Sequence, residues 1–411
     1  MIDSRVPVVV IDRGGNGTVA IARTLGRLGV RVYLVAQEGL PNPGWWSRYW
    51  ANRIRWDFSR SEEESVSFML DVGATIRADH GTPAILLTLA DWIAIFIERN
   101  SDALREQFVF PQPERPVIRA LLNKWEMRLL AKAHDIPTPA AAHPASFDEI
   151  DEFLARTDFP IVMKAAERYV GDPPPTKMIH SRQQLMDEVG DRDAGRASLN
   201  IVLQEYIPGD VDTVWMCNGY FGADPDRPVT FTGKKLRQLS AAGIASLAIC
   251  LPNETVDAQT RRFMRGVGYR GCVGIGWRYD DRDGLYKLLD VNARVSGVFR
   301  LFEGTNQMDV ARICYLDLTG QEVPVTALRP RRKWMLEDDF RAAATSVRSG
   351  QLTMAEWVRS IRGVREWHWL AVDDPLPFLA RLRDALRRRV QRNDEGPAEG
   401  PAREGRYEQQ R

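Results

Sequence analysis

The feature that most constrains the fold is a strand–turn–helix–strand pattern at the start of the chain. A short β-branched run at residues 6–12 is followed by three glycines. Apolar side chains then recur every three or four residues from Val19 to Leu28, which is the periodicity of a helix, and residues 30–35 form a second apolar run. This order favours a parallel sheet with helices on both faces. With a later apolar run at residues 82–89, it predicts a doubly wound (Rossmann-like) α/β domain over residues 1–115.

The glycine turn of this unit, Gly14-Gly15-Asn16-Gly17, leaves three interpretations open. It lacks the full spacing of a dinucleotide-binding fingerprint, and Ala36 and Gln37 stand where an acidic residue would close the second strand. A substrate anion held by the helix N-terminus near Thr18 is the second interpretation. A purely structural turn is the third.

Charge and cysteine usage exclude several classes of protein. The 411 residues include 56 basic and 55 acidic side chains, so the net charge is +1 and no basic field for nucleic acid or an anionic membrane is expected. The four cysteines are far apart and form no metal or redox motif. The N-terminus does not resemble a secretion signal, and the apolar runs are far shorter than the roughly 20 residues that span a bilayer. We therefore expect a cytoplasmic protein without nucleic-acid or membrane partners.

The rest of the chain mixes strands and helices without regular alternation. Residues 116–330 are expected to form an α+β core that begins with one helix from Val117 to His134, which Pro137 ends. Residues 331–392, rich in Arg and Trp, are expected to be a helical extension. Residues 393–411 are expected to be disordered, because they contain almost no apolar side chains.

Two lysines in the core are candidates for binding an anion. Lys124 lies within the predicted helix, and Lys164 ends the apolar strand that starts at Phe159. A charge at the end of such a strand is costly unless it has an anionic partner, and a polyphosphate is one such partner. The segment that follows, residues 167–176, contains three prolines and is expected to be a loop that covers the phosphates.

Two further segments carry polar groups at the ends of predicted strands. The segment Gln204 to Gly209 would hold a flat base, with a nearby carboxylate for ribose hydroxyls. Asp290 and Asn292 are two residues apart on a strand, so both side chains point to one face, where their oxygens suit Mg²⁺. Arg294 points the same way and would clamp a phosphate. A strand that simply runs into a polar turn is the alternative for this last segment.

The order of these motifs resembles that of the ATP-grasp family, in particular its carboxylate–amine ligases, over nearly the whole chain. The matching segments are Ile21 to Val30, Ser47-Arg48-Tyr49, Asn123-Lys124 through Pro139, Gln204 to Gly209, Thr232 to Gln238, and Asp290-Val291-Asn292-Ala293-Arg294. The resemblance implies an ATP-grasp fold over residues 116–330, with a lid at about 137–208, behind a pre-ATP-grasp domain at 1–115. It leaves the oligomeric state open, with a homodimer as one candidate because dimers are common among the resembling enzymes.

The resemblance implies an ATP-dependent, ADP-forming ligase that joins a small, amino-acid-like carboxylate to an amine through an acyl phosphate. It assigns Lys124 and Lys164 to the ATP phosphates, and Asp290 and Asn292 to Mg²⁺. It assigns Arg294 to the transferring phosphate. The remaining roles are adenine binding by Glu205, Tyr206 and Ile207, ribose binding by Asp212 or Asp210, and substrate binding by Arg237 and Lys235.

One departure from the family pattern concerns the metal site. The strand before Asp290 reads Gly274-Ile275-Gly276-Trp277-Arg278, and Gly276 stands where the family places an acidic ligand. Asp290 also replaces the usual glutamate. We therefore expect a site for one Mg²⁺. The alternative is a degenerate ATP-grasp protein that binds nucleotide in a regulatory or scaffold role.

Overall fold

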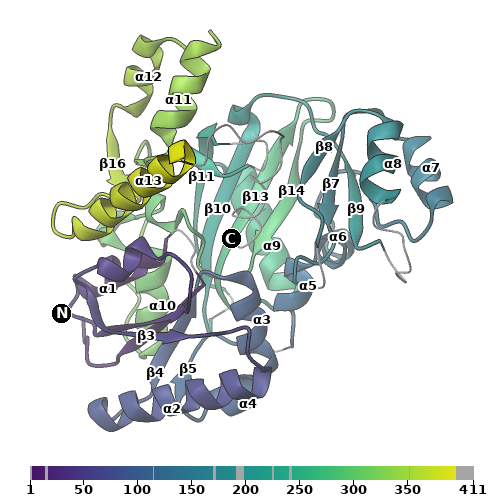
Figure 1. Cartoon of the computed structure of the whole chain (residues 1–411). Coiled ribbons are helices and arrows are strands. Elements are labelled where there is room, and N and C mark those ends of the chain that lie inside the picture. Colours follow the sequence, from purple (N-terminus) through teal and green to yellow (C-terminus); the bar gives the residue numbers. More distant parts are fainter. Residues whose placement is uncertain are drawn as a thin grey trace.

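The structure, a computed structural model, has three sheets (Figure 1), and a cleft lies between the four-stranded sheet and the seven-stranded sheet. It describes residues 2–13, 17–113, 115–169, 173–190, 199–224, 226–239, 243–350 and 352–394. The glycine turn at residues 14–16 and the tail from residue 395 lie outside this part of the chain, whereas Asn393 and Asp394 end a helix. Within the described residues, no helix is both long and apolar enough to cross a membrane.

The N-terminal sheet is parallel, as its strand–helix–strand pattern predicts, with strand order β3-β2-β1-β4-β5. Its strands are β1 (Val8–Asp12), β2 (Val32–Gln37), β3 (Trp50–Trp56), β4 (Ala84–Thr88) and β5 (Phe108–Val109). Its helices are α1 (Thr18–Gly26), η1 (Pro43–Trp46), α2 (Glu62–His80), α3 (Asp91–Arg99) and α4 (Ser101–Leu104). Alternate residues of β1 enter two different cores, so α1 covers one face and α2 to α4 cover the other.

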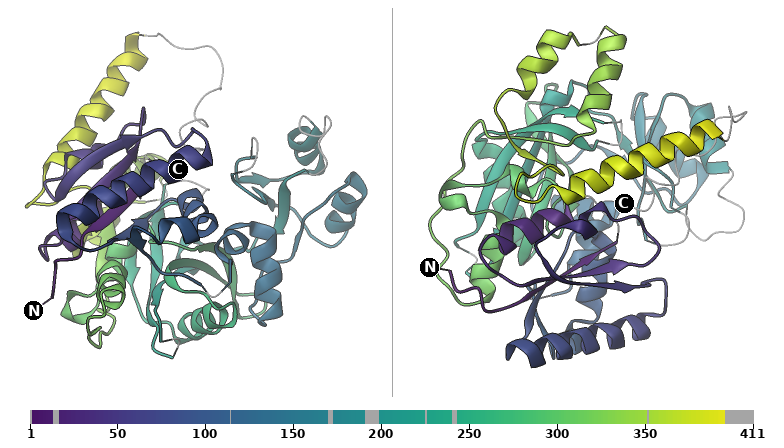
Figure 2. Two further views of the ribbon diagram at one scale, coloured as in Figure 1. Left: turned by 90° about the horizontal axis from the view of Figure 1, so that it is seen from below. Right: turned by 60° about the vertical axis from the view of Figure 1, so that its left-hand side comes forward.

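A four-stranded sheet with order β6-β9-β7-β8 projects from the rest of the molecule (Figure 2). Its elements are β6 (Ala141–Ala142), α7 (Phe147–Leu154), β7 (Ile161–Ala165), β8 (Lys177–Ile179), α8 (Arg182–Gly190) and β9 (Ile201–Glu205). Ile161 and Met163 of β7 are buried under α7 and α8. Because side chains alternate along a strand, Val162 and Lys164 face the opposite side, toward the cleft.

The central sheet has seven strands in the order β14-β13-β10-β11-β12-β15-β16. These strands are β10 (Val214–Phe221), β11 (Val229–Gln238), β12 (Ala245–Cys250), β13 (Gly271–Asp280), β14 (Leu285–Asn292), β15 (Lys333–Met335) and β16 (Val364–Trp367). The helices that accompany them are α5 (Ile118–Leu122), α6 (Lys124–Ala133), η2 (Val211–Thr213), α9 (Glu254–Gly266), η3 (Phe299–Leu301), η4 (Thr305–Gln307) and α10 (Val310–Leu318). Ile275 and Trp277 of β13 pack against α5, α6 and α9, which leaves Gly274 and Gly276 on the face that lines the cleft.

The C-terminal segment differs from the all-helical extension that its composition predicts. It contains α11 (Asp339–Arg348), α12 (Met354–Ile361) and α13 (Leu376–Asp394), but β15 and β16 extend the central sheet. Arg and Trp do not exclude a strand, and Trp334 and Met335 are buried when β15 pairs with β12. The predicted limits of the domains stay predictions.

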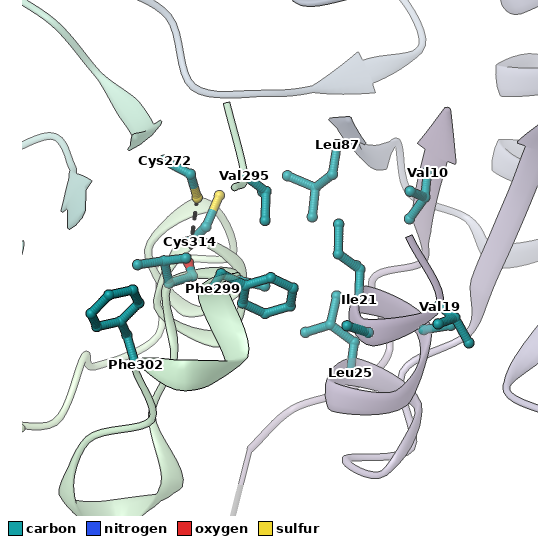
Figure 3. Packing of buried hydrophobic residues seen from close by; sticks show 14 of the residues in the cluster. Val10, Val19, Ile21, Leu25, Leu87, Cys272, Val295, Phe299, Phe302 and Cys314 are labelled. Atoms are coloured by element: carbon teal, nitrogen blue, oxygen red, sulfur yellow. Dashed lines mark hydrogen bonds between the residues drawn. The ribbon is translucent and has the colours of Figure 1, made fainter. Parts of the chain in front are cut away.

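One continuous core joins the N-terminal sheet to the central sheet. Ile21 and Leu25 of α1 face Phe299 across this core, with Leu87 and Val295 beside them (Figure 3). Cys272 and Cys314 lie at its edge, and all four cysteines are buried free thiols, as their spacing suggests. This packing brings the carboxyl ends of the N-terminal strands to the segment that follows β14.

Candidate active site

A cleft of about 470 Å³ lies between the four-stranded sheet and the central sheet. It gathers residues from nine helices and strands and from the loops between them. Nine of the predicted site residues line it: Lys124, Lys164, Glu205, Tyr206, Ile207, Lys235, Asp290, Asn292 and Arg294. These nine residues, which are far apart in the sequence, therefore lie around one cleft, as the sequence predicts.

Lys124 occupies the first turn of a helix rather than the middle of one. The chain breaks at Asn123, whose side-chain oxygen accepts hydrogen bonds from the backbone N–H groups of Trp125 and Glu126 at 3.0 Å each. This cap starts α6, so the prediction of a single helix from Val117 to His134 is wrong. The Asn123 side chain bonds the backbone N–H groups that would otherwise continue the preceding helix. The Lys124 N–H then donates to the Ala166 carbonyl at 2.9 Å, and its ammonium forms an ion pair with Asp290.

Lys164 lies deep in the cleft without a carboxylate partner in the described part of the chain. Its Nζ donates to Oε1 of Gln204, on the neighbouring strand β9, at 3.0 Å. Burial lowers the pKa of its ammonium to about 8, although Asp290 acts in the opposite direction. Lys164 is therefore a cation whose charge is poorly compensated, as a phosphate-binding lysine would be before its ligand arrives.

Lys235, on β11, is a second cation of this kind. Its Nζ donates to the Gly243 carbonyl, and no carboxylate of the described residues forms an ion pair with it. Burial, opposed by Asp290 and assisted by the Arg278 guanidinium, lowers its pKa to about 8. Lys164 and Lys235 thus approach the cleft from opposite sheets.

These two lysines predict that the cleft binds anions less well at high pH. Both have a pKa near 8, so their charge is present at pH 7 and is largely lost by pH 9. A ligand that requires the protonated form of one such lysine should bind about tenfold more weakly at pH 9 than at pH 7. Calorimetric titration of ATP at both pH values measures this. Lys164→Arg, which stays charged, should show a smaller pH dependence; an equal affinity of the wild type at both pH values would contradict the prediction.

The end of β14 carries the polar cluster that its sequence predicts. Burial would raise the pKa of the Asp290 carboxyl, but the Lys124 ammonium outweighs it and the net pKa is about 2. Nδ2 of Asn292 lies 3.3 Å from Oδ2 of Asp290, and Oδ1 of Asn292 accepts from Arg294 at 2.9 Å. Asp290 is therefore ionised at neutral pH and held next to an amide.

Gly276 lies directly opposite Asp290 in the β13–β14 pairing. A Cβ atom built on Gly276 would meet only Asp290, at 3.8 Å from its Cβ, so a larger side chain has room there. Within the described residues, no three His, Cys, Asp or Glu side chains gather into a metal site. The missing carboxylate is thus a property of this chain and not a consequence of crowding.

Asp290 and Asn292 fit one Mg²⁺. They supply a carboxylate and an amide oxygen on one face of β14, which are ligand types that Mg²⁺ accepts, with its other positions left to water and phosphate. Lys124 at present supplies the positive charge that Asp290 requires, as a metal ion would. Asn292 would share its oxygen with Arg294.

The segment after β9 lines the other end of the cleft. The Glu205 carboxylate accepts from the Ala140 N–H at 2.8 Å and from Arg282 at 3.0 Å. The Arg278 guanidinium lies over the Tyr206 ring, 5.3 Å from its centroid, and Ile207 is buried. The Glu205 side chain therefore fixes the segment from Gln204 to Gly209, which we call the hinge. The Tyr206 ring and the Ile207 side chain line the cleft, where they would contact a flat ligand.

Two predicted residues do not line this cleft in the described structure. Arg237 forms a paired contact with Asp339 of α11, at 2.8 Å for each hydrogen bond, and also donates to Ser360. Because the buried Asp339 needs this charge, Arg237 stabilises the C-terminal segment, and the cleft geometry gives no support to its assignment to the substrate, which stays a prediction. Asp212 lies on η2 with 62% of its side chain exposed, 3.3 Å from Lys234. The ribose assignment of Asp212 therefore lacks support from the cleft geometry.

The sequence reasoning missed several cleft residues. Arg168, Asn218, Arg278 and Ser296 all line it, and Ser296 Oγ donates to Asn218 Oδ1 at 2.6 Å. Asn218 lies on β10, a strand that was not predicted. Its one visible signal was the polar residue within an otherwise apolar run from Val214 to Phe221.

Comparison with known proteins agrees with this arrangement. No known protein-family profile matches the chain. The D-aspartate ligase of Enterococcus faecium is 24% identical over 260 residues, which are 60% of this chain and 61% of that ligase. The chain thus spans less than two thirds of the length of the curated relative that it matches.

Solved structures cover more of the chain. The L-amino acid ligase of Bacillus licheniformis has a TM-score of 0.57 at 15% identity, over 80% of this chain and 79% of that one. The carboxyaminoimidazole ribonucleotide synthase of Aspergillus clavatus, solved with ATP, has a TM-score of 0.60 at 12% identity, over 84% and 87%. The chain has the ATP-grasp fold, as its motifs predict. Its sequence is similar to that of D-aspartate ligase over 260 residues.

Proposed function

We propose that the protein is an ATP-dependent, ADP-forming carboxylate–amine ligase that acts on small, amino-acid-like substrates. The observation that carries the proposal is the meeting, in one cleft, of Lys124 and Lys164 with the Asp290–Asn292–Arg294 strand end. The hinge at Glu205 to Ile207 lines the same cleft. The similarity to D-aspartate ligase supports the reaction class.

The reaction would proceed in two displacements. A carboxylate oxygen of the first substrate attacks the γ-phosphorus of ATP, the bond to the β,γ-bridging oxygen breaks, and ADP leaves. The amine nitrogen of the second substrate then attacks the acyl carbon, phosphate leaves, and the amine loses a proton. The difficulty of the first step is that two anions must approach each other, so cations that are already in place lower the barrier.

The cleft residues supply these cations. Lys164 and Lys124 would hold the phosphates, and Lys124 would leave Asp290 for them when Mg²⁺ binds. Arg294 would contact the transferring phosphoryl group, and Lys235 the incoming carboxylate. Mg²⁺, held by Asp290 and Asn292, would neutralise charge on the phosphate oxygens. Tyr206 and Ile207 would bind adenine, with Glu205 holding the hinge.

A second function is favoured by one observation. Gly276 removes a carboxylate from the position opposite Asp290, and a protein that binds nucleotide without joining substrates would tolerate that loss. ADP release with pairs of amino acids separates the two functions, because the binding protein would release none. A homodimer stays a prediction.

The test of the nucleotide site is calorimetric titration of ATP with and without Mg²⁺. In the wild type, Mg²⁺ should tighten ATP binding about tenfold or more, and Asp290→Ala should abolish most of that gain because it removes the only carboxylate ligand. The matched control is Asp281→Ala, an exposed carboxylate on the β13–β14 turn, which should behave as the wild type. If the wild type binds no ATP, or if Asp290→Ala keeps the full Mg²⁺ effect, the proposed site is wrong.

A further inference from the structure

We propose that Asp91, the first residue of helix α3, which packs on the N-terminal sheet, is a positioning residue that orients Arg294 for phosphoryl transfer. The inference rests on the proposed function and adds to it a residue from outside the ATP-grasp core. Oδ1 of Asp91 accepts from Nε of Arg294 at 2.7 Å, across 203 positions of sequence. The two side chains are 17% and 16% exposed, so water screens the pair only partly.

The remaining contacts of Arg294 show what this orientation achieves. Nη1 donates to the Val295 carbonyl at 3.1 Å, and Nη2 donates to Oδ1 of Asn292 at 2.9 Å. A guanidinium has five N–H donors, so these bonds and the one to Asp91 leave two, one on each terminal nitrogen. Each of the two remaining donors can bond an oxygen of a phosphoryl group. Asp91 thus holds the Nε edge and leaves one N–H donor on each terminal nitrogen for the ligand.

The Asp91 carboxylate is not used to cap its own helix. The residue before α3, Ala90, provides no side-chain cap, and the Ala90 N–H donates to Thr88 instead. Both Asp91 oxygens are bonded to side chains from other segments: Oδ1 to Arg294 and Oδ2 to the hydroxyl of Tyr169 at 2.8 Å. A carboxylate with a purely helical role would bond the N–H groups of the first turn.

The bond to Tyr169 gives Asp91 a second effect on the cleft. Tyr169 follows Arg168, which lines the cleft, so anchoring Tyr169 also restrains Arg168. Burial and the negative charge of Asp91 raise the pKa of the Tyr169 hydroxyl, so it remains protonated and donates at neutral pH. One carboxylate of the N-terminal sheet therefore orders two cationic residues of the cleft.

The test compares Mg·ATP with Mg·ADP, because ADP lacks the phosphoryl group that Arg294 would contact. Asp91→Asn should weaken ATP binding about tenfold, which corresponds to about 1.4 kcal/mol, and change ADP binding less than twofold. Asp91→Glu, which keeps the charge, should recover most of the loss. Tyr169→Phe keeps the ion pair and should keep the ratio of ATP to ADP affinity. The matched control is Asp102→Asn, which changes an exposed carboxylate of α4, another helix that packs on the N-terminal sheet. It should change neither the ATP affinity nor the ADP affinity.

A double-mutant cycle with Arg294→Ala identifies the route of the effect. If Asp91 acts through Arg294, Asp91→Asn should add nothing to Arg294→Ala, although each alone weakens ATP binding. Equal losses of ATP and ADP affinity, or additive losses in the double variant, would overturn the inference. If the wild type itself binds no ATP, it is the proposed function that fails. If Arg294→Ala is selective for ATP but both Asp91 variants bind as the wild type does, only the role of Asp91 fails.

Discussion

Lys164→Met is expected to weaken ATP binding about 10- to 150-fold. Methionine keeps the length of the side chain and removes its charge, which would delete one charge-assisted phosphate contact worth about 1.5–3 kcal/mol. The structure supports a direct role, because Lys164 faces the cleft and, among the described residues, has only Gln204 as its side-chain partner there. Calorimetric titration with Mg·ATP measures the change.

The control for this prediction is the same substitution, lysine to methionine, at a position outside the cleft. Lys333, on β15, donates to the carbonyls of Ser360 and Arg362, and burial lowers its pKa as it does for Lys164. Lys333→Met should leave ATP affinity within about twofold of the wild type. An unchanged affinity in Lys164→Met, or an equal loss in both variants, would show that Lys164 does not bind the phosphates.

Asp374→Ala is expected to be the most destabilising of these substitutions. Asp374 is 1% exposed and accepts from Arg23 at 2.9 Å, from Ser47 Oγ at 2.7 Å and from the Arg48 N–H at 2.9 Å. Removing one partner of a buried ion pair leaves the other charge uncompensated, at a cost of about 3–5 kcal/mol. For a cooperative unit of about 150–250 residues, the melting temperature should fall by about 6–20 °C. Differential scanning calorimetry measures the shift.

The neighbouring aspartate is a matched control. Asp373 also pairs with an arginine, Arg27 at the end of α1, at 2.8 Å. However, 42% of the Asp373 side chain is exposed. Solvent-exposed pairs contribute about 0–1 kcal/mol, so Asp373→Ala should lower the melting temperature by at most about 4 °C. Equal shifts in the two variants would mean that burial does not decide the strength of these pairs.

The local motifs were predictable because each depends on residues close in sequence. The alternation of β7, which buries Ile161 and Met163 and exposes Lys164 to the cleft, follows from the two-residue period of a strand. The same period places Asp290 and Asn292 on one face of β14. The helix break at Asn123 was also a local signal, a capping residue, but the surrounding helical periodicity concealed it.

The sequence did not show contacts made across long distances along the chain. The family resemblance assigned Arg237 to a substrate, yet its charge is paired with Asp339, which follows it by 102 positions. The strands β15 and β16 were missed because these short, partly polar segments gain their stability from pairing, β15 with β12 and β16 with β15. Asp91 was not considered, since nothing in its own segment relates it to Arg294.

The sequence by itself determined the order of the motifs, whose resemblance to the ATP-grasp family predicted the fold, and nine residues of the cleft. The face of a strand on which such a residue lies depends on strand periodicity, and what it can bind depends on side-chain chemistry; both are local properties. The tertiary structure decided which charges remain for a ligand. Arg237 and Arg294 are both arginines near strand ends, but Asp339 binds the Nε and Nη2 of one, whereas Asp91 binds only the Nε of the other and leaves donors facing the cleft. Whether a charge is compensated depends on which residues packing brings within a few ångströms of it, and the order of residues along the chain does not specify that.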